Sequence, residues 1–166
     1  MFKINELIIY GNDGVCRVEE ICKLDVPGID KTKLYYVLKP LYYDGKIYVP
    51  IDTTVIMRSI ITDERANQLI DKIPTIEVEI CNNNNLREIS DYYKSFQLHN
   101  CEDLIRLIKT VYVKKSNAVN NRKKLGQTDE NYMRKAEDLL YGEFAAALNI
   151  PKENIKSYIE NRVEVI

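Results

Sequence analysis

Residues 7–21 read LIIYGNDGVCRVEEI, and this stretch decides how the first part of the chain folds. Four apolar residues lead into Gly11-Asn12-Asp13-Gly14, where glycine and asparagine tolerate the positive φ angles of a tight hairpin. From Val15 to Ile21 apolar and polar side chains alternate, as in a strand with one buried face. The stretch therefore predicts a β-hairpin near the start of the chain.

The same pattern of short apolar segments separated by turns continues to about residue 60. Strands are predicted at residues 4–10, 15–21, 34–38, 46–50 and 55–58, with a second hairpin turn at Asp44-Gly45. Five short strands joined by tight turns indicate a small, strongly bent sheet or partly open barrel. Such a sheet has edges at which a strand of another protein can pair. This part of the chain is thus predicted to be an interaction module.

From Thr62 onward the apolar spacing is almost entirely helical. Thr62 and Asn100 are predicted N-caps, and Thr128 is predicted to open the longest helix, which ends at Asn149. The run Asn82–Asn85 is predicted to be a loop. The sequence therefore predicts an α+β protein with a strand-rich domain at residues 1–60 and an all-helical domain at residues 61–166.

Charge is distributed unevenly although the net charge of the 166 residues is only −1. Residues 104–128 contain no acidic side chain. A local basic face can form in a protein that is nearly neutral overall, either as a solvated helix surface or as a surface that follows phosphates. The basic residues of this segment are Arg106, Lys109, Lys114, Lys115, Arg122, Lys123 and Lys124.

Other functional classes are poorly supported by the sequence. The four cysteines form no CxxC pair and His99 is the one histidine, so no metal or cofactor site is expected. No nucleophile–base–acid set is visible, so neither an enzyme nor a small-molecule substrate is expected. No apolar run reaches the length of a membrane span, and the charged segment Met1–Glu6 does not resemble a secretory signal. A cytoplasmic protein is therefore expected.

Several segments resemble the CarD/CdnL family of bacterial transcription regulators. Phe2–Tyr10, followed by Gly14 and Val18, is similar to the opening of that family. Four more segments follow in the order of the family, so that the resemblance covers about residues 2–148: Tyr36–Lys39, Ile47–Pro50, Ser90–Lys94 and Lys135–Glu143.

The resemblance implies a Tudor-like N-terminal domain that docks on the β subunit of RNA polymerase. It also implies a helical domain that contacts promoter DNA without sequence specificity, in the minor groove at the upstream edge of the transcription bubble. The expected function is a transcription regulator that stabilises the open promoter complex. The alternative is a protein–protein adaptor that docks on polymerase without contacting DNA.

Carried over by position, the polymerase-binding residues are expected to be Lys23, Leu24, Asp25 and Tyr48. Family members often carry arginine near Leu24 and Tyr48. Because this chain does not, the sequence favours docking by strand pairing with aromatic contact.

In the helical domain, Tyr93 and Lys94 match a family motif that lies next to DNA. Many members place a tryptophan wedge just before this motif, and here Ile89 falls at that position. Isoleucine can also serve as an apolar wedge between base steps. Non-specific attraction to phosphates is expected from Lys114, Lys115, Arg122, Lys123 and Lys124.

Overall fold

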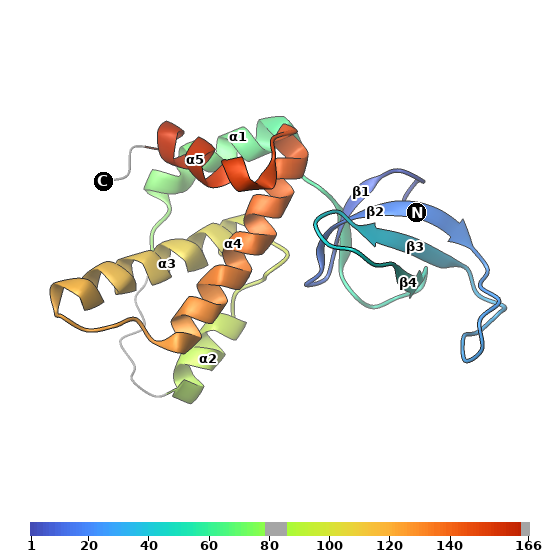
Figure 1. Cartoon of the computed structure of the whole chain (residues 1–166), viewed down its shortest axis with the longest axis horizontal. Helices are drawn as coiled ribbons and strands as arrows, with labels where there is room; N and C mark the ends of the chain where they lie inside the picture. The colour runs from blue at the N-terminus through green and yellow to red at the C-terminus, as the bar shows by residue number, and fades with distance from the viewer. Residues whose placement is uncertain (79–85, 164–166) are drawn as a thin grey trace. The chain divides into compact units, whose positions relative to one another are not determined.

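The computed structural model describes residues 1–78 and 86–163, and these residues divide into two compact units (Figure 1). The first is Met1–Ile61 and the second is Thr62–Ile166. Among the described residues, the strands lie in the first unit and the helices in the second, so the α+β fold class is confirmed. The predicted loop at Asn82–Asn85 lies outside the described residues.

The first unit is an antiparallel sheet of five strands in the order β4-β3-β2-β1-β5. Both sheet edges are therefore strands from the second half of this unit. The strands are β1 (Leu7–Tyr10), β2 (Gly14–Cys22), β3 (Tyr35–Pro40), β4 (Ile47–Pro50) and β5 (Met57–Ser59).

The first hairpin forms where the sequence predicts it, with Tyr10 paired to Gly14. Its turn uses positive φ angles at Gly11 (+46°) and Gly14 (+76°), which glycine adopts without steric cost. The prediction that β1 starts at Ile4 is wrong. Asn5 has a φ of +69° and the Glu6 amide donates to the Lys3 carbonyl, so a turn occupies these residues and β1 begins at Leu7.

Alternation along the strands builds the core of this unit. Side chains from β1, β2, β3 and β4 meet on one face of the sheet, where they exclude water. Partly buried side chains at the margins, such as Phe2 and Met57, complete the cluster. Its fully or nearly fully buried members are Ile8, Cys16, Val18, Tyr36, Leu38 and Val49.

The second unit is a helical bundle in which α4 contacts all four other α-helices. Its elements are α1 (Asp63–Lys72), the 3-10 turn η1 (Ile73–Thr75), α2 (Leu86–Lys94), α3 (Cys101–Asn120), α4 (Gln127–Leu148) and α5 (Lys152–Arg162).

Both predicted N-caps are confirmed. The Thr62 hydroxyl accepts a hydrogen bond from the Arg65 amide, and the Asn100 side chain accepts from the Glu102 and Asp103 amides. Thr128, in contrast, lies inside α4. The helix begins one residue earlier at Gln127, because Gly126 takes the extended N-cap conformation and its carbonyl accepts from the Glu130 amide. Asn149 ends α4 with a φ of +53°, as a left-handed cap.

Lys109, on α3, forms hydrogen bonds to the backbone of η1 and of the residue that follows it. Its ammonium donates to the carbonyls of Ile73 at 2.7 Å and Ile76 at 2.5 Å. Partial burial lowers the pKa of Lys109, since desolvation disfavours the charged form. This lysine therefore satisfies carbonyls left over where the first helix ends, and it is not part of an exposed basic face.

Candidate functional site

The outer edge of β4 is the first candidate surface. Within the described residues β4 pairs only with β3. The Ile51 amide donates to the Leu34 carbonyl at 3.0 Å, which makes residues 34 and 51 a hydrogen-bonded pair. Antiparallel pairs alternate, so the N–H and C=O groups of Tyr48 point away from β3 toward the open edge. Pro50 also faces outward, but it has no N–H and its carbonyl accepts from the Thr53 amide.

Within β4 this edge therefore offers one residue, Tyr48, for pairing with an added strand. The Tyr48 side chain is 49% exposed. Tyr48 pairs with Val37 on β3, and Val37 pairs with Glu20 on β2, so the three side chains lie on the same face of the sheet. An incoming strand would thus meet two backbone hydrogen-bonding groups and an aromatic ring together. This is the geometry of strand addition.

Ion pairs lie at both ends of β4. Lys46 contacts Glu19 at 3.1 Å before the strand, and Lys33 contacts Asp52 at 2.7 Å after it. The hydrogen bond to Asp52 raises the pKa of Lys33, and the same bond lowers the pKa of Asp52. These pairs are exposed, so each contributes little free energy.

The other predicted polymerase-binding residues, Lys23, Leu24 and Asp25, follow directly after β2. The last pairs of the sheet join Cys22 to Tyr35 and Tyr35 to Pro50. These paired residues lie two positions along the strands from the paired residues Glu20, Val37 and Tyr48. The register therefore brings the two predicted parts of the docking surface to the same end of the β2–β3–β4 face.

The predicted DNA-binding residues of α2 have two different environments. Ile89 and Tyr93 are buried among the helices, whereas Lys94 is exposed next to Asp91. The Tyr93 ring stacks on Tyr132 with centroids 4.7 Å apart. In this conformation Ile89 and Tyr93 position α2 and do not present a surface to a ligand. Their contact with DNA remains a prediction.

Tyr93 belongs to a buried polar cluster with Lys114 and Asp129. The Tyr93 hydroxyl donates to Asp129, and the Lys114 ammonium lies 2.6 Å from the same carboxylate oxygen. Lys114 also lies 5.7 Å from the centroid of the Tyr93 ring. The charge of Lys114 is thus neutralised inside the bundle. No signal in the sequence marks Asp129 as a core residue, because an acid in the first turn of a helix ordinarily faces water.

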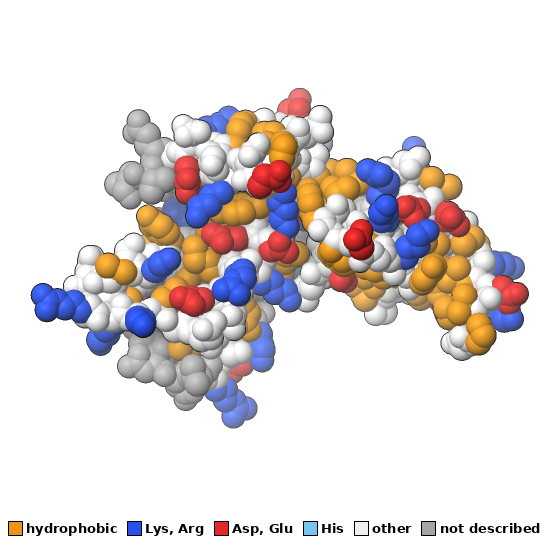
Figure 2. Space-filling model, viewed as in Figure 1, with side chains coloured by type: hydrophobic (Ala, Val, Ile, Leu, Met, Phe, Trp, Pro, Cys, Tyr) orange, Lys and Arg blue, Asp and Glu red, His pale blue; other side chains and the backbone are white. Residues whose placement is uncertain are grey.

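The remaining predicted cations lie on α3 (Lys115) and in the turn that joins it to α4 (Arg122, Lys123 and Lys124). Lys115, Arg122, Lys123 and Lys124 are exposed, and Figure 2 shows Lys and Arg side chains at this end of the helical unit. In the described part of the chain none of these four forms a salt bridge. We call these four residues the basic turn.

The backbone of the basic turn has an uncommon feature. The Lys123 amide donates to the Ala118 carbonyl at 2.7 Å and the Arg122 amide donates to the Val119 carbonyl at 3.0 Å, which together form a Schellman motif. Its left-handed position, where glycine is usual, holds Arg122 with a φ of +54°. The turn therefore accepts backbone strain and displays a guanidinium at its apex. No sequence pattern signalled this.

Sites of other kinds are not apparent. Over residues 1–78 and 86–163, no three His, Cys, Asp or Glu side chains come together as metal ligands do. None of the described helices combines the length and the hydropathy needed to cross a membrane.

A strand-rich module with an open edge, joined to a helical unit with a basic turn, defines an interaction protein. Residues 2–61 match the family model described as the CarD-like/TRCF RID domain. Residues 2–61 are thus recognised as a CarD-like domain, of a kind that interacts with RNA polymerase. No curated protein matches the chain significantly.

Proposed function

We propose that this protein is a cytoplasmic transcription regulator that docks on the β subunit of RNA polymerase and contacts promoter DNA through its helical unit. The observation that carries the docking half is the match of residues 2–61 to a polymerase-interacting domain. In this proposal a β-subunit strand pairs with the outer edge of β4 at Tyr48. The segment Lys23, Leu24 and Asp25 adds side-chain contacts at the same end of the sheet.

The DNA half of the proposal is supported by the basic turn and by Lys94. Its four exposed cations form no salt bridge with any described residue, and such a group favours a polyanion through release of the polyanion's counterions. Ile89, Tyr93 and Lys114 would support this surface from inside the bundle, because their side chains are largely withdrawn from solvent. The basic turn would contact the sugar–phosphate backbone of the DNA, so its binding would not depend on the base sequence.

The mechanism follows from linkage. A factor bound to polymerase shifts the equilibrium between closed and open promoter complexes by the difference in its binding free energy to the two states. Additional phosphate contacts made only in the open complex would supply that difference. About 1.4 kcal/mol would change the ratio of open to closed complexes tenfold.

The decisive experiment measures the lifetime of the open complex on a promoter fragment with purified polymerase holoenzyme. Wild-type protein should lengthen it. The triple variant Arg122→Gln, Lys123→Gln and Lys124→Gln should bind polymerase normally and lose most of the effect. The matched control removes the same charge from exposed positions elsewhere in the unit, with Arg134→Gln, Lys135→Gln and Lys156→Gln. If wild type binds polymerase but leaves the lifetime unchanged, the DNA half of the proposal fails.

An adaptor that binds polymerase without touching DNA is the second candidate. It is favoured by the burial of Ile89 and Tyr93, the two residues expected to lie against the duplex. An adaptor would bind polymerase with equal affinity in the presence and absence of promoter DNA. In the experiment above, neither triple variant would then differ from wild type.

A further inference from the structure

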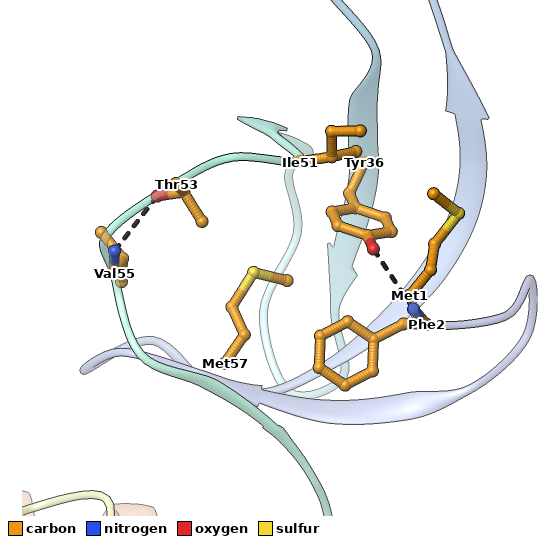
Figure 3. A pocket seen from close by; sticks show the side chains of 7 residues that line it. All are labelled: Met1, Phe2, Tyr36, Ile51, Thr53, Val55 and Met57. Atoms are coloured by element: carbon orange, nitrogen blue, oxygen red, sulfur yellow. Dashed lines mark hydrogen bonds between the residues drawn. The ribbon is translucent and has the colours of Figure 1, made fainter.

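A hollow of about 370 Å³ opens in the strand unit between the N-terminal residues and the segment that joins β4 to β5 (Figure 3). Its volume is near the lower end of the range for small-ligand sites, roughly 300–1,000 Å³. Phe2, Tyr36 and Met57 belong to the core cluster or pack against it. The other lining residues are Met1, Ile51, Thr53 and Val55, so none of the side chains around the hollow carries a charge.

The lining is held in place by hydrogen bonds. The Phe2 amide donates to the Tyr36 hydroxyl at 3.2 Å, and the two rings meet edge to face (Figure 3). On the opposite side, the Thr53 amide donates to the Pro50 carbonyl at 3.0 Å and the Val55 amide donates to the Thr53 hydroxyl at 3.2 Å. The site is therefore formed before any occupant arrives, which lowers the entropy lost on binding.

Gly11 lets the segment lie close to the sheet. A Cβ atom at Gly11 would stand 2.9 Å from Cγ1 of Val55, closer than such contacts occur. The Gly11 amide also donates to the Ile56 carbonyl at 2.9 Å. Even so, the Val55 side chain remains 42% exposed. The fold thus holds apolar side chains at fixed positions in water around an open hollow, an arrangement typical of a binding surface.

We propose that this hollow receives one large apolar or aromatic side chain from the polymerase segment that docks on β4. The inference rests on the proposed docking function. Six of the seven lining side chains are apolar or aromatic, which fits an apolar occupant, and the polymerase-interacting class of residues 2–61 identifies the partner that supplies it. The path is short, because Ile51 lines the hollow and lies three residues after Tyr48. At about 3.3 Å per residue, a strand paired at Tyr48 reaches the hollow within a few residues.

The test measures the affinity of the full chain for purified core polymerase without DNA. Val55→Asp places a carboxylate at the mouth of the hollow, and an apolar occupant would have to desolvate it. We expect binding about tenfold weaker or worse, as for an interface anchor. Val55→Ile keeps the lining apolar and should keep the affinity. Ile51→Asp, a second substitution in the lining, should repeat the loss.

The matched control is Ile56→Asp. Ile56 lies in the same segment and is 47% exposed, but it does not line the hollow. Its substitution should change the affinity by no more than about twofold, the usual effect at a neutral surface site. Thermal melting of each variant shows whether the fold is kept.

Three results would overturn the inference. If wild type binds and both Val55→Asp and Ile51→Asp bind equally well while folded, the hollow has no role and the docking proposal stands. If Ile56→Asp weakens binding as much as Val55→Asp, general contact with an apolar surface explains the loss. If wild type itself does not bind core polymerase, the docking proposal fails and the inference fails with it.

Discussion

Lys114 on α3 and Asp129 on α4 form an ion pair at 2.6 Å whose side chains are only 15% and 7% exposed. The Tyr93 hydroxyl donates to the same carboxylate from α2. Side chains from α2 and α3 therefore both bind the Asp129 carboxylate of α4. Such a pair is costly to break on one side, because the remaining charge stays buried without its partner.

Asp129→Ala should lower the free energy of unfolding by about 3 kcal/mol or more, since it leaves the Lys114 ammonium without its counter-charge. Urea denaturation followed by circular dichroism measures this change. Glu130→Ala is the matched control, because Glu130 is the exposed neighbouring acid, and its effect should stay within about 0.5 kcal/mol. Equal effects of the two substitutions would show that the cluster does not stabilise the bundle.

Arg122→Gly should separate stability from DNA binding. Glycine removes the steric cost of the left-handed conformation but adds entropy to the unfolded chain, so the free energy of unfolding should rise by about 0.5 kcal/mol. Affinity for duplex DNA should fall, and the slope of log K against log salt should decrease by about 1. Fluorescence anisotropy across a salt series measures both quantities. An unchanged salt slope would mean that this guanidinium does not contact phosphate.

Tyr48→Pro tests the edge of β4 directly. Proline removes the outward N–H while leaving the bonds to β3 intact, a position at which edge strands tolerate it. We expect a loss of polymerase binding larger than that caused by Tyr48→Ala, which removes only the side chain. Titration against immobilised core polymerase measures the two losses. Equal losses would indicate that docking depends on the ring and not on strand pairing.

We expect the strand unit to become less stable at acidic pH because of Glu6. Its carboxylate accepts from the Ser59 hydroxyl at 2.7 Å and from the Lys3 amide at 2.8 Å, and these bonds lower the pKa of Glu6. A lowered pKa means that the contribution of Glu6 is present above the ordinary glutamate pKa and is lost as the pH falls through the folded-state value. Glu6→Gln should therefore reduce the acid dependence of the melting temperature. A pH dependence identical to that of wild type would exclude this role.

The strand order within the first unit could be anticipated in part from local chemistry. The Gly11–Gly14 turn and the alternation after it specify the β1–β2 hairpin, because both signals depend on neighbouring residues only. The pairing of β5 with β1 joins residues about fifty apart, and no local signal specifies such a contact. The start of α4 was predicted one residue too late for a related reason, since Thr128 and the acids after it are typical of a helix start but Gly126 has the required N-cap conformation.

The candidate site was less accessible to sequence reasoning than the fold. Exposure of Tyr48 on an edge strand could be inferred from alternation and strand count. In contrast, burial depends on how helices pack, so the motif that resembles the DNA-contacting segment could not show that Ile89 and Tyr93 are buried in this structure. The hollow was also invisible, because its lining comes from three distant parts of the strand unit.

The narrow edge of β4 also bears on how the protein behaves at high concentration. Two copies that tried to join edge to edge there would gain a single pair of backbone hydrogen bonds within the strand before Pro50 ended the ladder. A strand from a different protein could still pair here, because other contacts between the two proteins would add to the free energy of this one pair of hydrogen bonds. Two copies of this chain would have only that pair at the β4 edge, which is too little to extend a sheet. The β4 edge is thus too short to seed aggregation.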